Sequence, residues 1–214
     1  MARRPGHRIH VSQSRHRCGD LVATRQAARR ALGLSQPTDR ETCRPRACWN
    51  GPVTSTSADR IGTLATERGI KVAVAESLTS GLVAAAVGKG ADAAEWFAGG
   101  IVAYQTEVKQ RLLGVSGGTD PCSAECAAQL ARGARELLDA DIAVSTTGVG
   151  GPDPEDGHAP GTVFVGWSFG DRAGARRLAI EGGPEEVLER AVDEALRILV
   201  ALAHGDEPVQ PRGD

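Results

Sequence analysis

The chain is poor in aromatic residues and has no long apolar stretch. Aromatic side chains make up 3% of its 214 residues and hydrophobic residues 41%, so we expect a core built from Ala, Val, Leu and Ile. No apolar run approaches the roughly 20 residues that are needed to cross a bilayer. No apolar segment follows the basic N-terminus in the way of a secretory signal. We therefore expect a cytoplasmic protein with no membrane partner.

Cysteine is scarce, and its count is odd. Five cysteines without a secretory signal argue against a disulfide framework. Cys43 and Cys48, with His16 and Cys18 upstream, could be read as zinc ligands, but their spacing matches no common zinc site. We expect no metal.

Lysine is almost absent, since the 25 basic residues include only three lysines. Residues 1–50 hold eleven Arg, no Lys and three acidic residues. Such a block is typical of a nucleic-acid-binding arm or a transit peptide. Its prolines and its lack of periodicity favour a disordered extension, or upstream sequence read in frame. We expect a basic extension over residues 1–52, no nucleic-acid partner, one domain over 53–204 and a polar tail over 205–214.

Hydrophobic spacing predicts alternating helices and strands. Helices are expected over residues 58–69, from 81 to about 87, and over 107–113, 123–139 and 184–203. Strands are expected over residues 71–75, 97–105 and 142–146, with a hairpin formed by 162–169 and 175–180. Ser57, Thr106 and Ser123 are the predicted N-caps. The alternation predicts an α/β fold, and the closing hairpin makes the sheet mixed.

Three polar loops follow the predicted parallel strands, where open α/β sheets bind their ligands. They are residues 76–81, 104–109 and 147–151. The first carries Ser77 and Thr79 at the start of a helix. Backbone N–H groups there can hold an anion or a developing oxyanion, or the two hydroxyls can serve as ordinary caps.

The second loop contains the chain's single tyrosine, Tyr104, and one of its three lysines, Lys109. Unlike Arg, Lys can lose its proton. With Thr106 as N-cap, Lys109 falls in the first helical turn, where the positive helix end disfavours an ammonium ion. Lys109 is therefore a candidate base, and the alternative is an ordinary exposed lysine.

The third loop is rich in glycine but does not open into a helix, because Pro152 and Pro154 follow it. It is therefore not a dinucleotide-binding turn. Its glycines either let a ligand approach the backbone closely or form a surface turn. His158, the only histidine near these loops, is expected to be solvated. A serine–lysine pair is then the natural alternative to a triad for activating a serine.

Taken in order, these motifs resemble the CinA C-terminal domain family, the nicotinamide-nucleotide amidohydrolases. Members carry Glu-Ser-x-Thr-x-Gly after a strand, as in residues 76–81. A Tyr-x-x-x-x-Lys segment follows, as in 104–109. A later strand ends in a hydroxyl residue, Gly and a Gly-Pro pair, as in 147–152. The resemblance covers about 150 residues.

The resemblance implies a three-layer α/β/α sandwich around a mixed, roughly five-stranded sheet. It also implies hydrolysis of nicotinamide mononucleotide to nicotinic acid mononucleotide and ammonia, as in NAD salvage, without a metal or organic cofactor. The partner is then a small-molecule nucleotide, and a homo-oligomer is expected. The implied catalytic residues are Ser77 as nucleophile, Lys109 as its base and Tyr104 in support of proton transfer. The implied substrate-lining residues are Thr79, Thr147 and Gly148.

One departure from the family pattern bears on the substrate. Members carry Gly-Asp-Arg before the last helix, whereas this chain has Gly-Gly-Pro at residues 182–184. Arg176, Arg177 and Arg190 are the candidates to replace the missing arginine. Two alternatives therefore stay open. One is an amidase of the same mechanism with a different substrate, phosphorylated or not, and the other is a non-catalytic nucleotide-binding or competence-related module.

Overall fold

The computed structural model describes residues 56–206 and 208. The predicted extension over residues 1–52 and most of the predicted tail lie outside the described residues. The elements, in chain order, are α2 (Ser57–Arg68), β1 (Val72–Glu76), α3 (Leu82–Val87), α4 (Ala93–Trp96), β2 (Phe97–Val102), α5 (Thr106–Leu113), α6 (Ala124–Leu137), β3 (Ile142–Gly148), β4 (Thr162–Phe169), β5 (Arg172–Ala179) and α7 (Pro184–His204). None of the helices between Ser57 and His204 is both long enough and apolar enough to cross a membrane.

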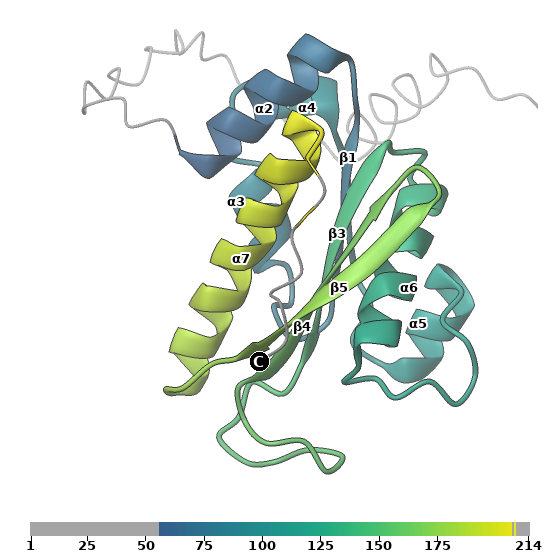
Figure 1. The fold of residues 1–214 in the computed structure, drawn as a ribbon, viewed down its shortest axis with the longest axis vertical. Helices are drawn as coiled ribbons and strands as arrows, with labels where there is room; N and C mark the ends of the chain where they lie inside the picture. The colour runs from purple at the N-terminus through teal and green to yellow at the C-terminus, as the bar shows by residue number, and fades with distance from the viewer. Residues whose placement is uncertain (1–55, 207, 209–214) are drawn as a thin grey trace, which may run out of the picture. The chain divides into compact units, whose positions relative to one another are not determined.

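The five strands form one mixed sheet in the order β2-β1-β3-β4-β5. β1 is parallel to both β2 and β3, and β4 and β5 form the antiparallel hairpin. Helices α2, α3 and α7 cover one face of the sheet, and α5 and α6 cover the other (Figure 1). The predicted three-layer sandwich with a five-stranded mixed sheet is confirmed.

The interior strand β1, which lies between β2 and β3, is buried along its whole length. Successive side chains of a strand point to opposite faces, so Val72 and Val74 pack on the α2 and α7 side, whereas Ala75 packs on the α6 side. Because helices cover both faces of the sheet, the sequence of β1 does not alternate between apolar and polar residues. The core contains the expected small aliphatic residues, but it also contains Trp96 and Trp167, which the aromatic-poor composition did not predict.

Two of the three predicted N-caps are displaced by one residue. Thr56, not Ser57, caps α2, because its hydroxyl accepts the N–H of Asp59 while the Asp59 carboxylate accepts the N–H of Thr56. In α5 the N-cap is Gln105, and Thr106 is the first helical residue. Ser123 caps α6 as predicted.

Candidate active site

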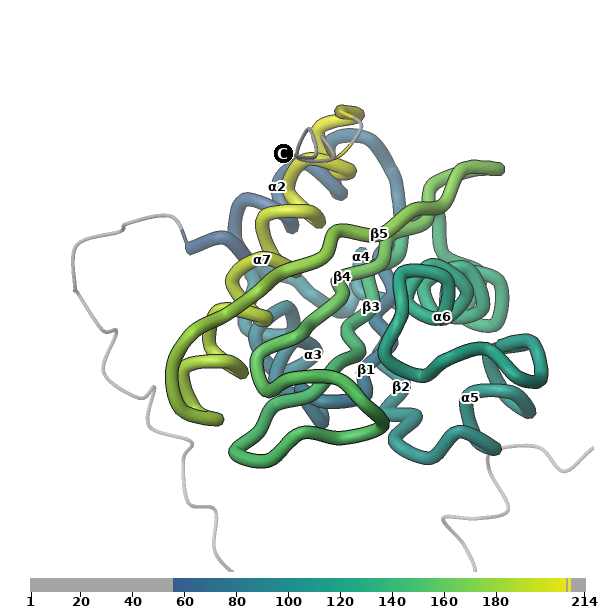
Figure 2. The backbone as a smooth tube through the Cα atoms, turned by 60° about the horizontal axis from the view of Figure 1, so that its bottom comes forward, coloured from purple at the N-terminus to yellow at the C-terminus, as the bar shows by residue number. Residues whose placement is uncertain are grey.

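The three predicted loops meet at one edge of the sheet. Because β1, β2 and β3 are parallel, their carboxyl ends lie together, with β1 between the other two (Figure 2). In the register of the sheet, Glu76 at the end of β1 is opposite Val102 in β2 and Thr146 in β3. The residues that follow these three positions therefore approach one another.

A cavity opens at this edge of the sheet. Its lining comes from the three loops, from the segment before α6 and from the segment after β3: Ser77, Leu78, Tyr104, Thr106, Lys109, Pro121, Cys122, Thr147, Gly148, Val149, Glu155 and Asp156. An adjoining hollow shares part of this lining and extends to Pro184 and Leu188 of α7. The two hollows form one cleft. Of the predicted site residues, the cleft brings together Ser77, Tyr104, Lys109, Thr147 and Gly148.

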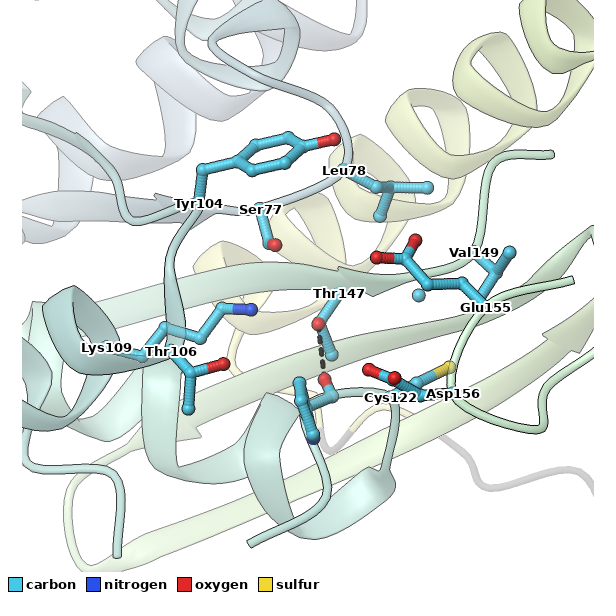
Figure 3. A pocket seen from close by; sticks show the side chains of 12 residues that line it. Ser77, Leu78, Tyr104, Thr106, Lys109, Cys122, Thr147, Val149, Glu155 and Asp156 are labelled. Atoms are coloured by element: carbon cyan, nitrogen blue, oxygen red, sulfur yellow. Dashed lines mark hydrogen bonds between the residues drawn. The ribbon is translucent and has the colours of Figure 1, made fainter. Parts of the chain in front are cut away.

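Ser77 is held on a tight turn directly after β1. Its N–H donates to the carbonyl of Thr146 at 3.0 Å, which extends the pairing with β3 by one residue. Both the N–H and the hydroxyl of Ser80 donate to the Ser77 carbonyl. The residue is 7% exposed, and its hydroxyl points into the cavity (Figure 3). The backbone around the predicted nucleophile is thus fixed by hydrogen bonds.

The carboxylate of Glu76 caps helix α3 from inside the protein. It accepts the backbone N–H groups of Gly81, Val83 and Ala84 at 3.0, 3.0 and 2.8 Å, and the N-cap residue itself provides no side-chain bond. A carboxylate is favourable at the positive end of a helix. These N–H groups are consequently not free to hold a substrate anion or an oxyanion, as one interpretation of the loop had supposed.

Sequence reasoning quoted Glu76 as a motif residue but gave it no role. A signal was available, because an acidic residue that ends a wholly apolar strand must find partners if it is buried.

Thr79 does not line the cavity, so the lining gives no support to its predicted contact with substrate. The residue is 0% exposed. Its hydroxyl lies 2.6 Å from a carboxylate oxygen of Glu76 and 2.6 Å from the hydroxyl of Thr146. The physical reason is that the buried Glu76 carboxylate needs donors, and Thr79 provides one.

Lys109 is buried, with 4% of its surface exposed, so it is not the ordinary exposed lysine of the alternative interpretation. It lies in the first turn of α5, where its N–H donates to the carbonyl of the N-cap residue Gln105. Its amine extends into the cavity toward Ser77 and Thr147 (Figure 3). Over residues 56–206, no ion pair found in the structure involves Lys109.

Tyr104 forms the outer wall of the cavity and is 66% exposed. Its ring lies beside Ser77, with the hydroxyl directed toward Leu78 and away from Lys109 (Figure 3). A wall position suits contact with a flat substrate ring. Its support of proton transfer stays a prediction.

Thr147 and Gly148 form the floor of the cavity. The Thr147 hydroxyl donates to the carbonyl of Pro121 at 2.6 Å, which ties β3 to the segment before α6. Gly148 has a φ of 147°. A Cβ atom there would lie 2.3 Å from the carbonyl oxygen of Thr162. Glycine is therefore required at this position by the close approach of β4, not by a ligand.

Cys122 also lines the cavity, although sequence reasoning did not assign it to the site. It is 6% exposed, and its Sγ donates to the carbonyl of Thr162. Burial, with a further contribution from the charge of Asp120, raises the pKa of the Cys122 thiol to about 11. Since the thiolate is the nucleophilic form, Cys122 is a poor nucleophile near neutral pH. Ser77 is the better candidate.

The segment between β3 and β4 brings carboxylates to the cleft. Glu155 and Asp156 line the cavity, and Asp153 lines the adjoining hollow. The side chain of His158, which was predicted to be solvated, is 27% exposed, and it also has a partner. Its Nε2 lies 2.8 Å from a carboxylate oxygen of Asp120, which anchors this segment to the region before α6. His158 is absent from the lining of the cleft.

None of the three arginines considered as replacements lines the cleft. Arg176 forms an ion pair with Glu194 of α7, and neither Arg177 nor Arg190 lines either hollow. Among the residues that the structure describes, Lys109 is the only lysine or arginine in the lining. The same part of the chain contains no group of three or more His, Cys, Asp or Glu residues that could hold a metal ion.

Known proteins share both the sequence and the fold. A sequence model of the CinA C-terminal domain matches residues 54–203. A competence-damage inducible protein from Bacillus velezensis is 42% identical over 140 residues, a match that covers 64% of this chain and 34% of that protein. A second, from Bacillus subtilis, is 36% identical over the same length. The chain therefore spans about a third of the length of these relatives.

Solved structures extend the likeness to the fold. A competence-damaged protein (CinA) superfamily protein from Escherichia coli matches with a TM-score of 0.65 at 30% identity, covering 68% of this chain and 88% of that one. A CinA superfamily protein from Klebsiella pneumoniae matches with a TM-score of 0.65 at 32% identity, covering 69% and 96%. With the family match over residues 54–203, these likenesses show that the chain belongs to the CinA C-terminal domain family.

Proposed function

We propose that the chain is an amidohydrolase that releases ammonia from the carboxamide of a ribosylated nicotinamide. The reference reaction is the one that the family motifs imply, the conversion of nicotinamide mononucleotide to nicotinic acid mononucleotide. The proposal is carried by one observation: Ser77 and the buried Lys109 reach into the same cavity (Figure 3).

The chemistry follows from these two side chains. Ser77 Oγ attacks the carboxamide carbon while the neutral amine of Lys109 accepts the hydroxyl proton. The tetrahedral intermediate then collapses, and ammonia leaves after receiving that proton from Lys109. The product of this half-reaction is an acyl ester on Ser77. Water, activated by the same amine, attacks the ester and releases the carboxylic acid.

Two further observations support a serine–lysine mechanism. The thiol of Cys122 is kept protonated near neutral pH by its raised pKa of about 11, so it does not compete as nucleophile. His158 is engaged with Asp120 and lies outside the lining. The lysine amine is then the basic side chain best placed to deprotonate Ser77.

The direct test is ammonia release from nicotinamide mononucleotide by the wild type and by Ser77→Ala. We expect the variant to lose activity while keeping its fold. Ser57→Ala is the control, because Ser57 is exposed at the start of α2 and does not line the cavity. Activity of Ser77→Ala within tenfold of the wild type would remove Ser77 from the mechanism.

The relatives' names keep a second candidate open. The Bacillus proteins are named for competence damage and not for an amidase. If this chain is a non-catalytic nucleotide-binding module, it should bind nicotinamide mononucleotide but release no ammonia from any carboxamide. Such a module has no need of a buried lysine beside a serine, and for this reason we favour the enzyme.

A further inference from the structure

The cleft combines one cation with several carboxylates. Glu155 and Asp156 face the cavity across from Ser77 and Lys109, and the carboxylate of Glu155 points inward (Figure 3). Asp153 lines the adjoining hollow. Within the described residues, the only lysine or arginine in the lining is Lys109. A cleft lined mainly by one sign of charge concentrates ligands of the opposite sign.

At two of the helix starts near the cleft, a carboxylate of the chain itself accepts backbone N–H groups. Glu76 takes three N–H groups at the start of α3. At the start of α7, which borders the adjoining hollow, Glu186 accepts the N–H of Gly183 at 2.9 Å, and Pro184 has no N–H to offer. A free helix N-terminus is a common phosphate site, and these carboxylates compete for that role at α3 and α7. The start of α5, where Thr106 lines the cavity, has no side-chain cap, but Glu107 places a negative charge in its first turn.

In the described part of the chain, the lining also contains no arginine that could bind a phosphate group. Arg176 on β5 forms an ion pair with Glu194 on α7. A phosphate group in the cleft would therefore meet the carboxylates of the segment after β3 without the arginine fork that usually binds it.

We propose that the site selects an unphosphorylated, cationic carboxamide, of the class of an N-ribosylated pyridinium nucleoside. This inference rests on the proposed amidohydrolase function and names its substrate class. The pyridinium ring carries one positive charge that the carboxylates of Glu155 and Asp156 attract, whereas a 5′-phosphate adds negative charge that they repel. Glu155 and Asp156 are then specificity-determining residues. Because both are exposed at the rim, salt should weaken their effect.

The experiment compares kcat/KM for ammonia release from nicotinamide riboside and from nicotinamide mononucleotide at low ionic strength. For the wild type we expect the riboside to be favoured about tenfold or more, since a tenfold ratio needs only about 1.4 kcal/mol, and the preference should shrink as salt is added. The double variant Glu155→Gln, Asp156→Asn should lower the ratio several-fold. Asp171→Asn, in the hairpin turn at the opposite end of the sheet, is the control and should leave the ratio unchanged.

A wild-type preference for the mononucleotide would overturn the inference, as would a ratio that the double variant does not alter. Binding of the two compounds to Ser77→Ala, measured by calorimetry, separates this inference from the proposed function. If the wild type hydrolyses neither compound, the amidohydrolase proposal fails, and tighter binding of the riboside still supports the charge selection. If turnover occurs but the mononucleotide binds more tightly, only the charge selection fails.

Discussion

The hydroxyl of Thr79 donates a hydrogen bond to the carboxylate of Glu76 at 2.6 Å, and both side chains are buried. Thr79→Val keeps the shape of the side chain but removes this donor. We expect the free energy of unfolding to fall by about 1–3 kcal/mol, because a buried polar partner loses a hydrogen bond. Urea denaturation measures the change. Thr79→Ser, which retains the hydroxyl, should lose less, and equal losses for the two variants would contradict the assigned role.

Lys109 offers the sharpest test of the mechanism. Lys109→Arg keeps the charge but cannot supply a neutral base near pH 7. If Lys109 deprotonates Ser77, the Arg and Met variants should both lose kcat by about 10² or more. If it only attracts the substrate electrostatically, Arg should restore kcat and mainly alter KM. Steady-state kinetics with nicotinamide mononucleotide and nicotinamide riboside distinguish these outcomes, and near-normal kcat in Lys109→Arg would refute the serine–lysine proposal.

Cys122 should react slowly with alkylating agents. With a pKa of about 11, only about one thiol in a thousand is ionised at pH 8. Site-resolved mass spectrometry after iodoacetamide treatment should therefore find Cys122 largely unmodified in the folded chain, and modified in urea. Rapid modification of the folded chain would contradict the buried thiol.

The same thiol predicts how stability changes at high pH. When folding raises the pKa of a group, the group's contribution to the stability of the folded state is fully present at pH values below its pKa in the unfolded chain. That contribution is lost as the pH rises to the pKa in the folded chain. For Cys122 the contribution is fully present below about pH 9 and lost by about pH 11. Thermal melts from pH 8 to 11 should show a smaller decline in Cys122→Ala than in the wild type.

The start of α2 provides a paired comparison of neighbouring residues. Thr56→Ala removes the cap on the Asp59 N–H and should cost about 1 kcal/mol of unfolding free energy. Ser57→Ala, at the first helical position, should cost much less. The hydrogen bonds from Thr56 also lower the pKa of Asp59 below its ordinary value of 3.8. The contribution of ionised Asp59 to the stability of the folded state is therefore present above pH 3.8 and lost in stronger acid. The difference in unfolding free energy between Thr56→Ala and Ser57→Ala should narrow in that acid range.

Much of the architecture was predictable, because local patterns determine it. The apolar run of β1, the glycine at the end of α2 and the hairpin between β4 and β5 each have a short-range signal. The place of the cavity followed from a topological rule, that ligands bind beyond the carboxyl ends of parallel strands. The four-residue helix α4 had no such signal, since a single turn has too few residues to show a periodicity.

The roles of individual side chains were harder to predict, because they depend on contacts between distant segments. Thr79 and Thr146 are far apart in the sequence, so the bridge between them had no local signature. The pairing of His158 with Asp120 is of the same kind. The position of a hydroxyl in a motif predicts that it matters, but only the tertiary structure shows whether it faces the cavity or the core.

The position of β1 between two parallel strands has a consequence for how the site can change over evolution. Ser77 directly follows β1, which is buried along its whole length, and its N–H is bonded to β3, so amide exchange there should require a large opening of the fold. Glu155 and Asp156, in contrast, lie on an exposed connection, where substitutions cost little stability. The proposed nucleophile and the residues that we infer to select the substrate by its charge thus lie in parts of different rigidity. On this proposal, mutation can change selectivity while the backbone of Ser77 stays in place.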